Sequence, residues 1–369
     1  MHRDASPIAM RTPLYDRHVA LNAKIVDFHG WDMPLYYSGI INEHMAVREN
    51  FGYFDVSHMG DVIVEGKDSG RFLDHLLPTQ VSRLEAGKAA YTAFLDESGN
   101  IIDDTIVYRL SADKFFFVPN ASTTGEIVKW ASSHSDGLDV TLRNVSSEIA
   151  CIALQGPRAT IAAQKIGIRE PEPFTFYSQE SGDRNSITGN REIIVSGTGY
   201  TGEKGMELIV PASEAEKYWI KLEGLTRELG GQPCGLGSRD TLRMEKGMLL
   251  SGTDFDHNRT PFEASVGFIV NEEHEFIGKE SLLKSKSSRN EIFRGFKVDG
   301  KAIPRSGFPL MAGGKRIGTV TSGSISPVLK IPIALGFLDK SYSKEGTAVK
   351  VRIRSEEYPA TVSKPRIIR

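Results

Sequence analysis

A glycine-rich segment at residues 197–202, Gly-Thr-Gly-Tyr-Thr-Gly, has the G-x-G-x-x-G spacing of a dinucleotide-binding loop. Such a loop follows a strand and opens a helix, because the pyrophosphate binds the free N–H groups at the helix N-terminus. The apolar run at 191–196 supplies the strand. After the glycines, residues 206–210 alternate and end at Pro211, a pattern that is typical of a second strand. The segment therefore predicts a β-hairpin and argues against a dinucleotide site.

Three side chains of this hairpin could still serve a ligand. Tyr200, Glu203 and Glu207 combine a flat aromatic surface with carboxylates. That combination suits a neutral polar heterocycle better than a polyphosphate.

The first 270 residues mix helical and strand patterns. Residues 89–121 alternate around two turn sequences, which predicts an antiparallel meander. Its strands are expected at 90–95, 101–110 and 115–120, and a buried strand at 149–154. Helical patterns occur at 38–51, 159–166, 215–229 and 238–248, and a further helix is expected to run toward Ser133. Thr123 with Glu126, and Ser213 with Glu216, match the capping box.

The C-terminal part of the sequence has a different pattern of predicted secondary structure. Residues 272–290 form a charged stretch that predicts a linker with a short helix. From residue 292 onward the strands are short and alternating, with turn residues such as Gly313 and Gly314 between them. This pattern predicts a small β-barrel or sandwich.

Composition excludes several classes of function. Among 369 residues, Lys plus Arg number 45 and Asp plus Glu 47, so no basic field is available to hold nucleic acid. No apolar run approaches the roughly 20 residues of a membrane span. The histidines form no H-x-x-x-H pair, so no metal site is expected. Cys151 and Cys234 are expected to be free thiols in a reducing cytoplasm.

Two adjacent carboxylates, Asp103 and Asp104, lie within a predicted strand. Neighbouring strand residues point to opposite faces, so one of the pair is expected to face inward. A buried carboxylate is costly unless it is paired or functional. The alternative is a β-bulge or turn in which both side chains are exposed to solvent.

Arg239 lies at or near the start of a predicted helix, where the helix dipole disfavours a cation. A ligand carboxylate could form two parallel hydrogen bonds with its planar guanidinium group. Pairing with Asp240 or Glu245 is the alternative.

Eight segments, in order along the chain, together resemble the glycine cleavage T-protein family of aminomethyltransferases. The resemblance runs from about Arg11 to Arg366. The matching segments are 11–15 (RTPLY), 26–31 (VDFHGW), 54–60 (FDVSHMG), 99–104 (GNIIDD), 154–157 (LQGP), 199–203 (GYTGE), 234–240 (CGLGSRD) and 321–327 (TSGSISP).

The resemblance implies a reaction and a catalytic residue. The family moves an aminomethyl group from the lipoyl arm of the H protein to tetrahydrofolate, releasing ammonia and 5,10-methylenetetrahydrofolate. Asp104 would be the catalytic carboxylate beside the reacting folate nitrogens. The remaining residues that match folate-binding positions are Met59, Tyr91, Tyr108, Asn120, Tyr200, Glu207 and Arg239. Glu207 would accept from pterin N–H groups, and Arg239 would bind a carboxylate of the glutamate tail.

The resemblance also implies an α+β fold, a three-domain cloverleaf. Two interleaved antiparallel α/β lobes would come from residues 1–275, the folate-binding region, and a β-barrel domain from 290–369. The implied partner is the lipoylated H protein, with a functional link to the P and L proteins.

Two positions depart from the family pattern. Asn100 stands where many members have a second glycine, which asparagine tolerates because it can adopt positive φ. Gly197 stands where some members have arginine, so ligand contacts made by that side chain would be lost.

Two rival functions share the family's fold. One is another folate-dependent one-carbon transferase, such as a demethylase of sulfonium or N-methyl substrates. The other is a non-catalytic folate-binding protein of iron–sulfur assembly, which carries a Lys-Gly-Cys-Tyr-like motif. Here residues 245–249 read Glu-Lys-Gly-Met-Leu, without the thiol.

Overall fold

The computed structural model describes residues 9–180 and 192–368. Contacts divide the chain into two compact units. Unit 1 comprises the described residues within 1–59, 145–199 and 203–239. Unit 2 comprises 60–144, 200–202 and the described residues after 239. The chain therefore passes from one unit to the other and back, as interleaved lobes require.

Unit 1 is built on a six-stranded sheet in the order β10-β11-β12-β9-β3-β13. Its strands are antiparallel except for the short pair β13 and β3. The bounds are β3 Gly52–Asp55, β9 Ile149–Gln155, β10 Phe176–Glu180, β11 Glu192–Ser196, β12 Gly205–Pro211 and β13 Gln232–Cys234. A separate hairpin joins β1 (Lys24–Phe28) to β2 (Trp31–Tyr36).

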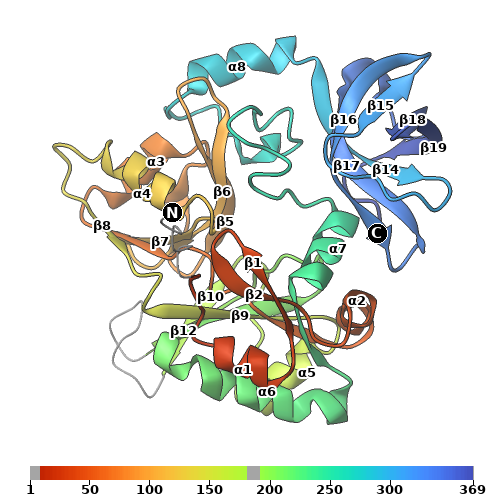
Figure 1. The fold of residues 1–369 in the computed structure, drawn as a ribbon. Helices are drawn as coiled ribbons and strands as arrows, with labels where there is room; N and C mark the ends of the chain where they lie inside the picture. The colour runs from red at the N-terminus through yellow and green to blue at the C-terminus, as the bar shows by residue number, and fades with distance from the viewer. Residues whose placement is uncertain (1–8, 181–191, 369) are drawn as a thin grey trace, which may run out of the picture. The chain divides into compact units, whose positions relative to one another are not determined.

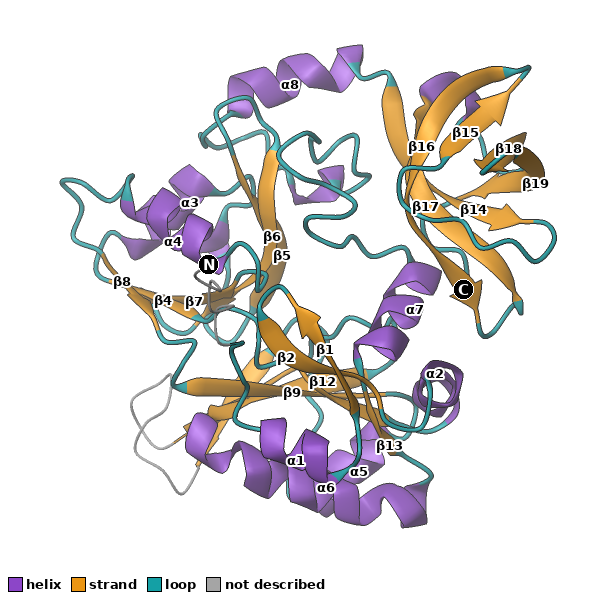
Figure 2. Ribbon diagram, viewed as in Figure 1, coloured by secondary structure: helices purple, strands orange, loops and turns teal. Residues whose placement is uncertain are grey.

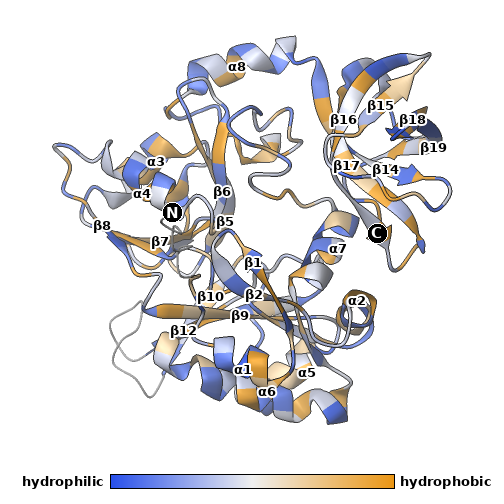
Figure 3. Ribbon diagram, in the orientation of Figure 1, coloured by the Kyte–Doolittle hydropathy of each residue, from blue (hydrophilic) through white to orange (hydrophobic). Residues whose placement is uncertain are grey.

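Helices cover one face of this sheet. Figure 1 shows α1 (Tyr15–Ala20), α5 (Ala159–Lys165) and α6 (Ala215–Leu229) on the same side of β9 and β12. Their buried side chains, such as Trp219, join the sheet residues in one core. In Figure 3, α6 carries both hydrophilic and hydrophobic residues, as expected of a helix with a single buried face. Helix α2, also in this unit, spans Ile40–Glu49.

Unit 2 contains a five-stranded antiparallel sheet in the order β5-β6-β7-β4-β8. The strands are β4 Val62–Glu65, β5 Ala89–Leu95, β6 Ile101–Arg109, β7 Lys114–Val118 and β8 Thr141–Asn144. Helices α3 (Ser69–Leu76) and α4 (Thr124–Ser132) pack on it through a shared apolar core. The predicted meander is confirmed, with β6 between β5 and β7.

The C-terminal part of unit 2 is a closed barrel in the order β14-β17-β16-β15-β18-β19 (Figure 2). Its strands are β14 Glu291–Val298, β15 Pro309–Ala312, β16 Lys315–Ser326, β17 Ile331–Asp339, β18 Ala348–Ile353 and β19 Glu356–Ser363. The linker helix α8 spans Lys279–Ser288. The predicted α+β class, with two α/β lobes and a barrel, is confirmed. The boundary drawn between residues 275 and 290 stays a prediction.

Local details correct the sequence expectations at both helix starts. The Thr123 hydroxyl donates to the carbonyl of Asn120 at 3.2 Å and does not cap α4, so the expected capping box is wrong. Helix α6 takes Glu214 as its N-cap, one residue after Ser213, because a 3₁₀ turn leads directly into it. The α6 end is as predicted, with Gly230 in the left-handed conformation at φ 72°.

Candidate active site

The centre of the candidate site is the pair Asp103 and Asp104 on β6. In the pairing of β6 with β5, Asp103 lies opposite Phe94 and Asp104 opposite Ala93, whereas the pairing of β6 with β7 begins only at Ile106. Asp103 has no exposed surface, and Asp104 is only partly exposed. The alternative in which both side chains are exposed to solvent is therefore wrong. A register shift does occur nearby, between Phe94 and Leu95 of β5.

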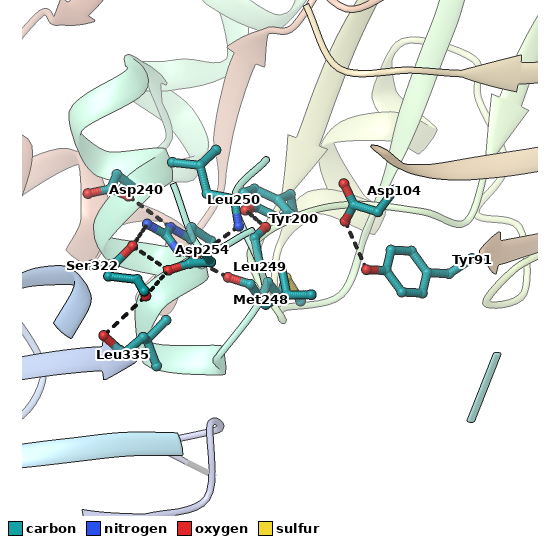
Figure 4. Close-up of polar contacts among 12 residues, drawn as sticks. Tyr91, Asp104, Tyr200, Asp240, Met248, Leu249, Leu250, Asp254, Ser322 and Leu335 are labelled. Carbon is teal, nitrogen blue, oxygen red and sulfur yellow. Dashed lines mark hydrogen bonds and ion pairs between the residues drawn. The ribbon is translucent and has the colours of Figure 1, made fainter. Parts of the chain in front are cut away.

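Tyr91 of β5 and Asn120, just after β7, both hydrogen-bond to Asp104. The Tyr91 hydroxyl donates to Asp104 Oδ2 at 2.8 Å (Figure 4). Nδ2 of Asn120 lies 2.8 Å from Oδ1 of both Asp103 and Asp104. Three of the predicted site residues are thus brought together, from β5, from β6 and from the segment just after β7.

The environment raises the proton affinity of both carboxyl groups. Burial raises the pKa of Asp104 to about 7, and the adjacent charge of Asp103 contributes in the same direction. Burial also raises the pKa of Asp103, against the hydrogen bonds that it accepts. The pKa of the Tyr91 hydroxyl lies well above its ordinary value, because it is buried and faces Asp104. Asp104 can therefore exchange a proton near neutral pH, whereas Tyr91 stays a donor.

Tyr108 and Tyr200 are the other predicted aromatic residues of unit 2. Tyr108 lies four residues after Asp104 on β6, hence on the same face, and is fully buried against Phe116 of β7. Tyr200 donates its hydroxyl to the carbonyl of Leu249 (Figure 4). Its hydroxyl also contributes to the raised pKa of Tyr91, which places Tyr200 in the electrostatic surroundings of the site.

An exposed aromatic residue, Phe268, was not found from sequence. Its ring lies 6.1 Å from that of Tyr91, and 76% of the residue is exposed. Only its place in the apolar segment 266–270 gave a signal, and that is equally typical of a core residue.

The loop 248–254 joins the carboxyl pair to a buried ion pair that sequence analysis also missed. Ser251 donates to Asp103 at 2.8 Å. Asp254 accepts a hydrogen bond from Nη1 of Arg243, on α7 (Leu236–Lys246), at 2.6 Å, and Arg243 also donates to the carbonyl of Met248. Figure 4 labels the two acceptor residues, Asp254 and Met248. The loop that carries Ser251 and Leu249 is thus fixed at both ends.

The glycine-rich segment is the tip of the predicted hairpin, between β11 and β12. Its glycines permit close backbone approach: a Cβ at Gly199 would lie 2.1 Å from the Gln155 amide oxygen, and Gly202 has φ +69°. The departure at Gly197 has a local reason, because a Cβ there would lie 2.2 Å from the carbonyl of Glu172. A larger side chain would require this backbone to shift.

The departure at Asn100 needs a different explanation from the one expected. Gly99 adopts φ +80°, whereas Asn100 is not among the residues with positive φ. The N–H of Asn100 donates to Asp96 at 2.8 Å within the turn. The loss of a second glycine therefore carries no backbone strain here.

Unit 1 holds the remaining predicted residues. Glu207 lies on the face of β12 opposite the helix-covered core and accepts from the Thr198 hydroxyl. Arg239 is in the first turn of α7, and Met59 ends the turn after β3. Burial and the Arg239 charge lower the pKa of the neighbouring His58 to about 4, so this imidazole is neutral. His58 was not predicted, and its Nδ1 is buried without a hydrogen-bond partner.

Potential metal ligands are scattered in the described part of the chain. Within 9–180 and 192–368, no group of three His, Cys, Asp or Glu side chains could hold a metal ion. None of the helices in these ranges combines the length and apolar character needed to cross a membrane. Cys151 and Cys234 are free thiols.

Known proteins resemble this chain over nearly its whole length. Residues 14–274 match the GCVT N-terminal domain family, and 293–368 match the glycine cleavage T-protein C-terminal barrel domain. The aminomethyltransferase of Thermotoga maritima is 44% identical over 331 residues, 90% of each chain. A probable aminomethyltransferase of Halobacterium salinarum is 42% identical over 369 residues, 97% of this chain and 99% of the other.

A solved structure extends the similarity to the fold. The crystal structure of glycine cleavage system aminomethyltransferase T from Bartonella henselae aligns with a TM-score of 0.89 and 30% identity. The alignment covers 97% of this chain and 98% of that one.

Proposed function

The chain belongs to the glycine cleavage T-protein family and is an aminomethyltransferase, and we propose that it takes the aminomethyl group from the lipoyl arm of the H protein. The acceptor is tetrahydrofolate. The products are 5,10-methylenetetrahydrofolate, ammonia and dihydrolipoyl H protein. The observation that carries this proposal is the buried carboxyl pair, in which Asp104 has a pKa of about 7 and is held by Tyr91 and Asn120.

The proposed reaction forms two bonds from the transferred carbon to folate, at N5 and N10. The C–S bond to the lipoyl arm and the C–N bond to the amino group break. N5 and N10 each lose a proton, and sulfur and ammonia each gain one. Ionised Asp104 accepts the proton that N5 loses, and before that transfer it stabilises the positive charge on the attacking nitrogen.

The other predicted residues have binding roles in this proposal. Tyr91, Tyr108, Asn120, Tyr200 and Met59 surround the folate, Glu207 accepts from the pterin, and Arg239 binds the glutamate tail. In this proposal the protein binds the lipoylated H protein as its partner. It is functionally linked to the P and L proteins of the glycine cleavage system. We further propose that it works in the cytoplasm.

The direct test is ammonia release from aminomethylated H protein with tetrahydrofolate. Dependence of the release on both components is the expected result. Turnover only with sulfonium or N-methyl donors would instead identify a demethylase, and folate binding without any turnover would identify a non-catalytic protein.

Turnover is expected to fall as the pH is lowered through about 7. The pKa of Asp104 is raised to about 7 by burial and by Asp103, and only the ionised carboxylate accepts a proton. Below that midpoint kcat should fall about tenfold per pH unit, and above it kcat should reach a plateau. A pH–rate profile from about pH 5 to about pH 9 measures this, and an acid limb near the ordinary carboxyl pKa of about 4 would contradict it.

Replacing Arg239 with alanine is expected to weaken folate binding by about tenfold or more, since a hydrogen bond to a charged group contributes roughly 1.5–3 kcal/mol. Titration calorimetry with monoglutamyl and polyglutamyl tetrahydrofolate measures the two affinities. The matched control is Arg227→Ala, which removes an exposed arginine from the last turn of α6. If Arg239→Ala bound both ligands as tightly as wild type, the assigned role would be wrong.

A further inference from the structure

The two adjacent carboxyl groups on β6 differ in how they are held. Asp103 accepts from the backbone N–H of Asn120, from its Nδ2 and from Ser251 Oγ, each at 2.8 Å. Both oxygens of this completely buried side chain are therefore occupied by donors. Three hydrogen-bond donors to one carboxyl group favour its ionised form, the carboxylate, which bears no proton.

Asp104 is less completely held. Each of its oxygens accepts one side-chain hydrogen bond, from Tyr91 and from Asn120. Because a carboxylate oxygen can accept two bonds, Asp104 keeps acceptor capacity, and part of its surface is exposed. The two neighbours are thus unequal: one is saturated and enclosed, the other open to a reacting group.

Asn120 links the two groups. Its Nδ2 donates to Asp103 and Asp104, and its backbone N–H donates to Asp103 as well. Turning this carboxamide over would place its oxygen against both carboxyl groups and lose the two side-chain bonds. Asp103 therefore fixes the orientation of a side chain that contacts Asp104.

We propose that Asp103 is a positioning residue for the aminomethyl transfer: it stays ionised, holds Asn120 and Ser251 in place, and leaves proton exchange to Asp104. In the proposed reaction the proton lost by N5 passes to Asp104, while Asp103 keeps its charge throughout. The inference rests on the proposed function only for what it says of turnover, because the division of roles belongs to the free protein.

Two tyrosines of the described part of the chain belong to the electrostatic surroundings of the pair. Tyr91 approaches from β5, and Tyr200 contributes to the electrostatics of Tyr91. Burial and Asp104 keep the pKa of Tyr91 well above its ordinary value, so its hydroxyl remains neutral. The proton taken up near neutral pH therefore resides on Asp104, because the hydrogen bonds to Asp103 keep that neighbour ionised.

The test is a ¹³C NMR titration of the full-length, ligand-free protein labelled at the aspartate carboxyl carbons. Loss of one signal in Asp104→Asn assigns the Asp104 resonance. In Asp103→Asn we expect the Asp104 midpoint to fall by about one pH unit, a tenfold stronger acid, because the neighbouring charge is gone. Asp113→Asn, which changes an exposed aspartate between β6 and β7, should leave the midpoint in place. An unchanged or raised midpoint in Asp103→Asn would overturn the proposal.

Ser251→Ala provides the test if Asp103→Asn does not fold. It removes one donor from Asp103 and keeps the charge, so Asp103 should take a larger share of the proton. The acidity constant of Asp104 should then rise about twofold to threefold, which lowers its titration midpoint, and no change would refute the inference.

Turnover separates this inference from the proposed function. Under the proposed function, the acid limb of kcat in Asp103→Asn should move down with the Asp104 midpoint. Reduced kcat with an unmoved acid limb and an unmoved midpoint would show a merely structural role and overturn the inference. If wild type released no ammonia while the midpoint still fell in Asp103→Asn, the proposed function would fail and the role of Asp103 would stand.

Discussion

Replacing Asp104 with asparagine is expected to lower turnover by about 10² or more, while the fold is kept and folate binding stays within about tenfold. The carboxamide has almost the same shape and can still contact Tyr91 and Asn120, both of which lie 2.8 Å from Asp104. It cannot accept a proton or balance a positive charge. Ammonia release from aminomethylated H protein measures the loss, and near wild-type turnover would refute the catalytic role.

The same variant should be more stable than wild type at pH 8. A carboxyl group whose pKa is raised in the folded state favours folding while it is protonated, and stability falls as the pH rises from about 4 to about 7. Above that range the folded protein holds an unfavourable charge at Asp104, with its pKa of about 7. Asparagine removes this charge, so the gain should be at least about 1 kcal/mol at pH 8 and absent near pH 4.

A denaturant series at both pH values checks the direction. Asp113→Asn is again the matched control, because its exposed carboxyl has a lowered pKa from the hydrogen bond with Ser111 and should give no gain at pH 8. An Asp104→Asn protein that is no more stable than wild type at pH 8 would show that the charge of Asp104 costs nothing in the folded state.

Much of the fold can be predicted from local patterns in the sequence. The meander could be predicted because β5, β6 and β7 are consecutive and separated by clear turn residues. The hairpin at β11 and β12 could be predicted because alternation resumes after the glycines. The order of the six-stranded sheet could not, since β3 lies between β9 and β13, which are far from it in sequence. Such pairings depend on long-range packing that no local pattern records.

The candidate site divides in the same way. The inward position of a carboxylate on β6 follows from strand geometry, but residue spacing cannot show that Asn120 touches both Asp103 and Asp104. Nor could the sequence indicate that Ser251, nearly 150 residues away, would donate to Asp103. The resemblance supplied Asn120 as a site residue, whereas only the three-dimensional structure gives its bridging contacts.

The buried ion pair of Arg243 and Asp254 explains how the loop bearing Ser251 is held. Arg243 is 2% exposed, and Asp254 also accepts from the hydroxyls of Thr321 and Ser322 on β16 at 2.5 and 2.8 Å. Burial acts to lower the pKa of Arg243, but Asp254, Tyr200 and Asp240 together outweigh burial, so the net pKa is raised. The Arg243 guanidinium therefore stays charged. Removing it would leave the buried Asp254 carboxylate without its ion-pair partner.

Arg243→Met is accordingly expected to lower the free energy of unfolding by about 3–5 kcal/mol, because it removes the ion-pair partner of the buried Asp254. Urea denaturation measures the change. The double variant Arg243→Met/Asp254→Leu should recover much of the loss, since apolar groups can replace a buried ion pair at little cost. Arg352→Met is the matched control: Arg352 pairs with Glu357 at 2.7 Å but is 41% exposed, so a change below about 1 kcal/mol is expected. Equal losses in Arg243→Met and Arg352→Met would contradict the assigned role, and so would a double variant no more stable than Arg243→Met.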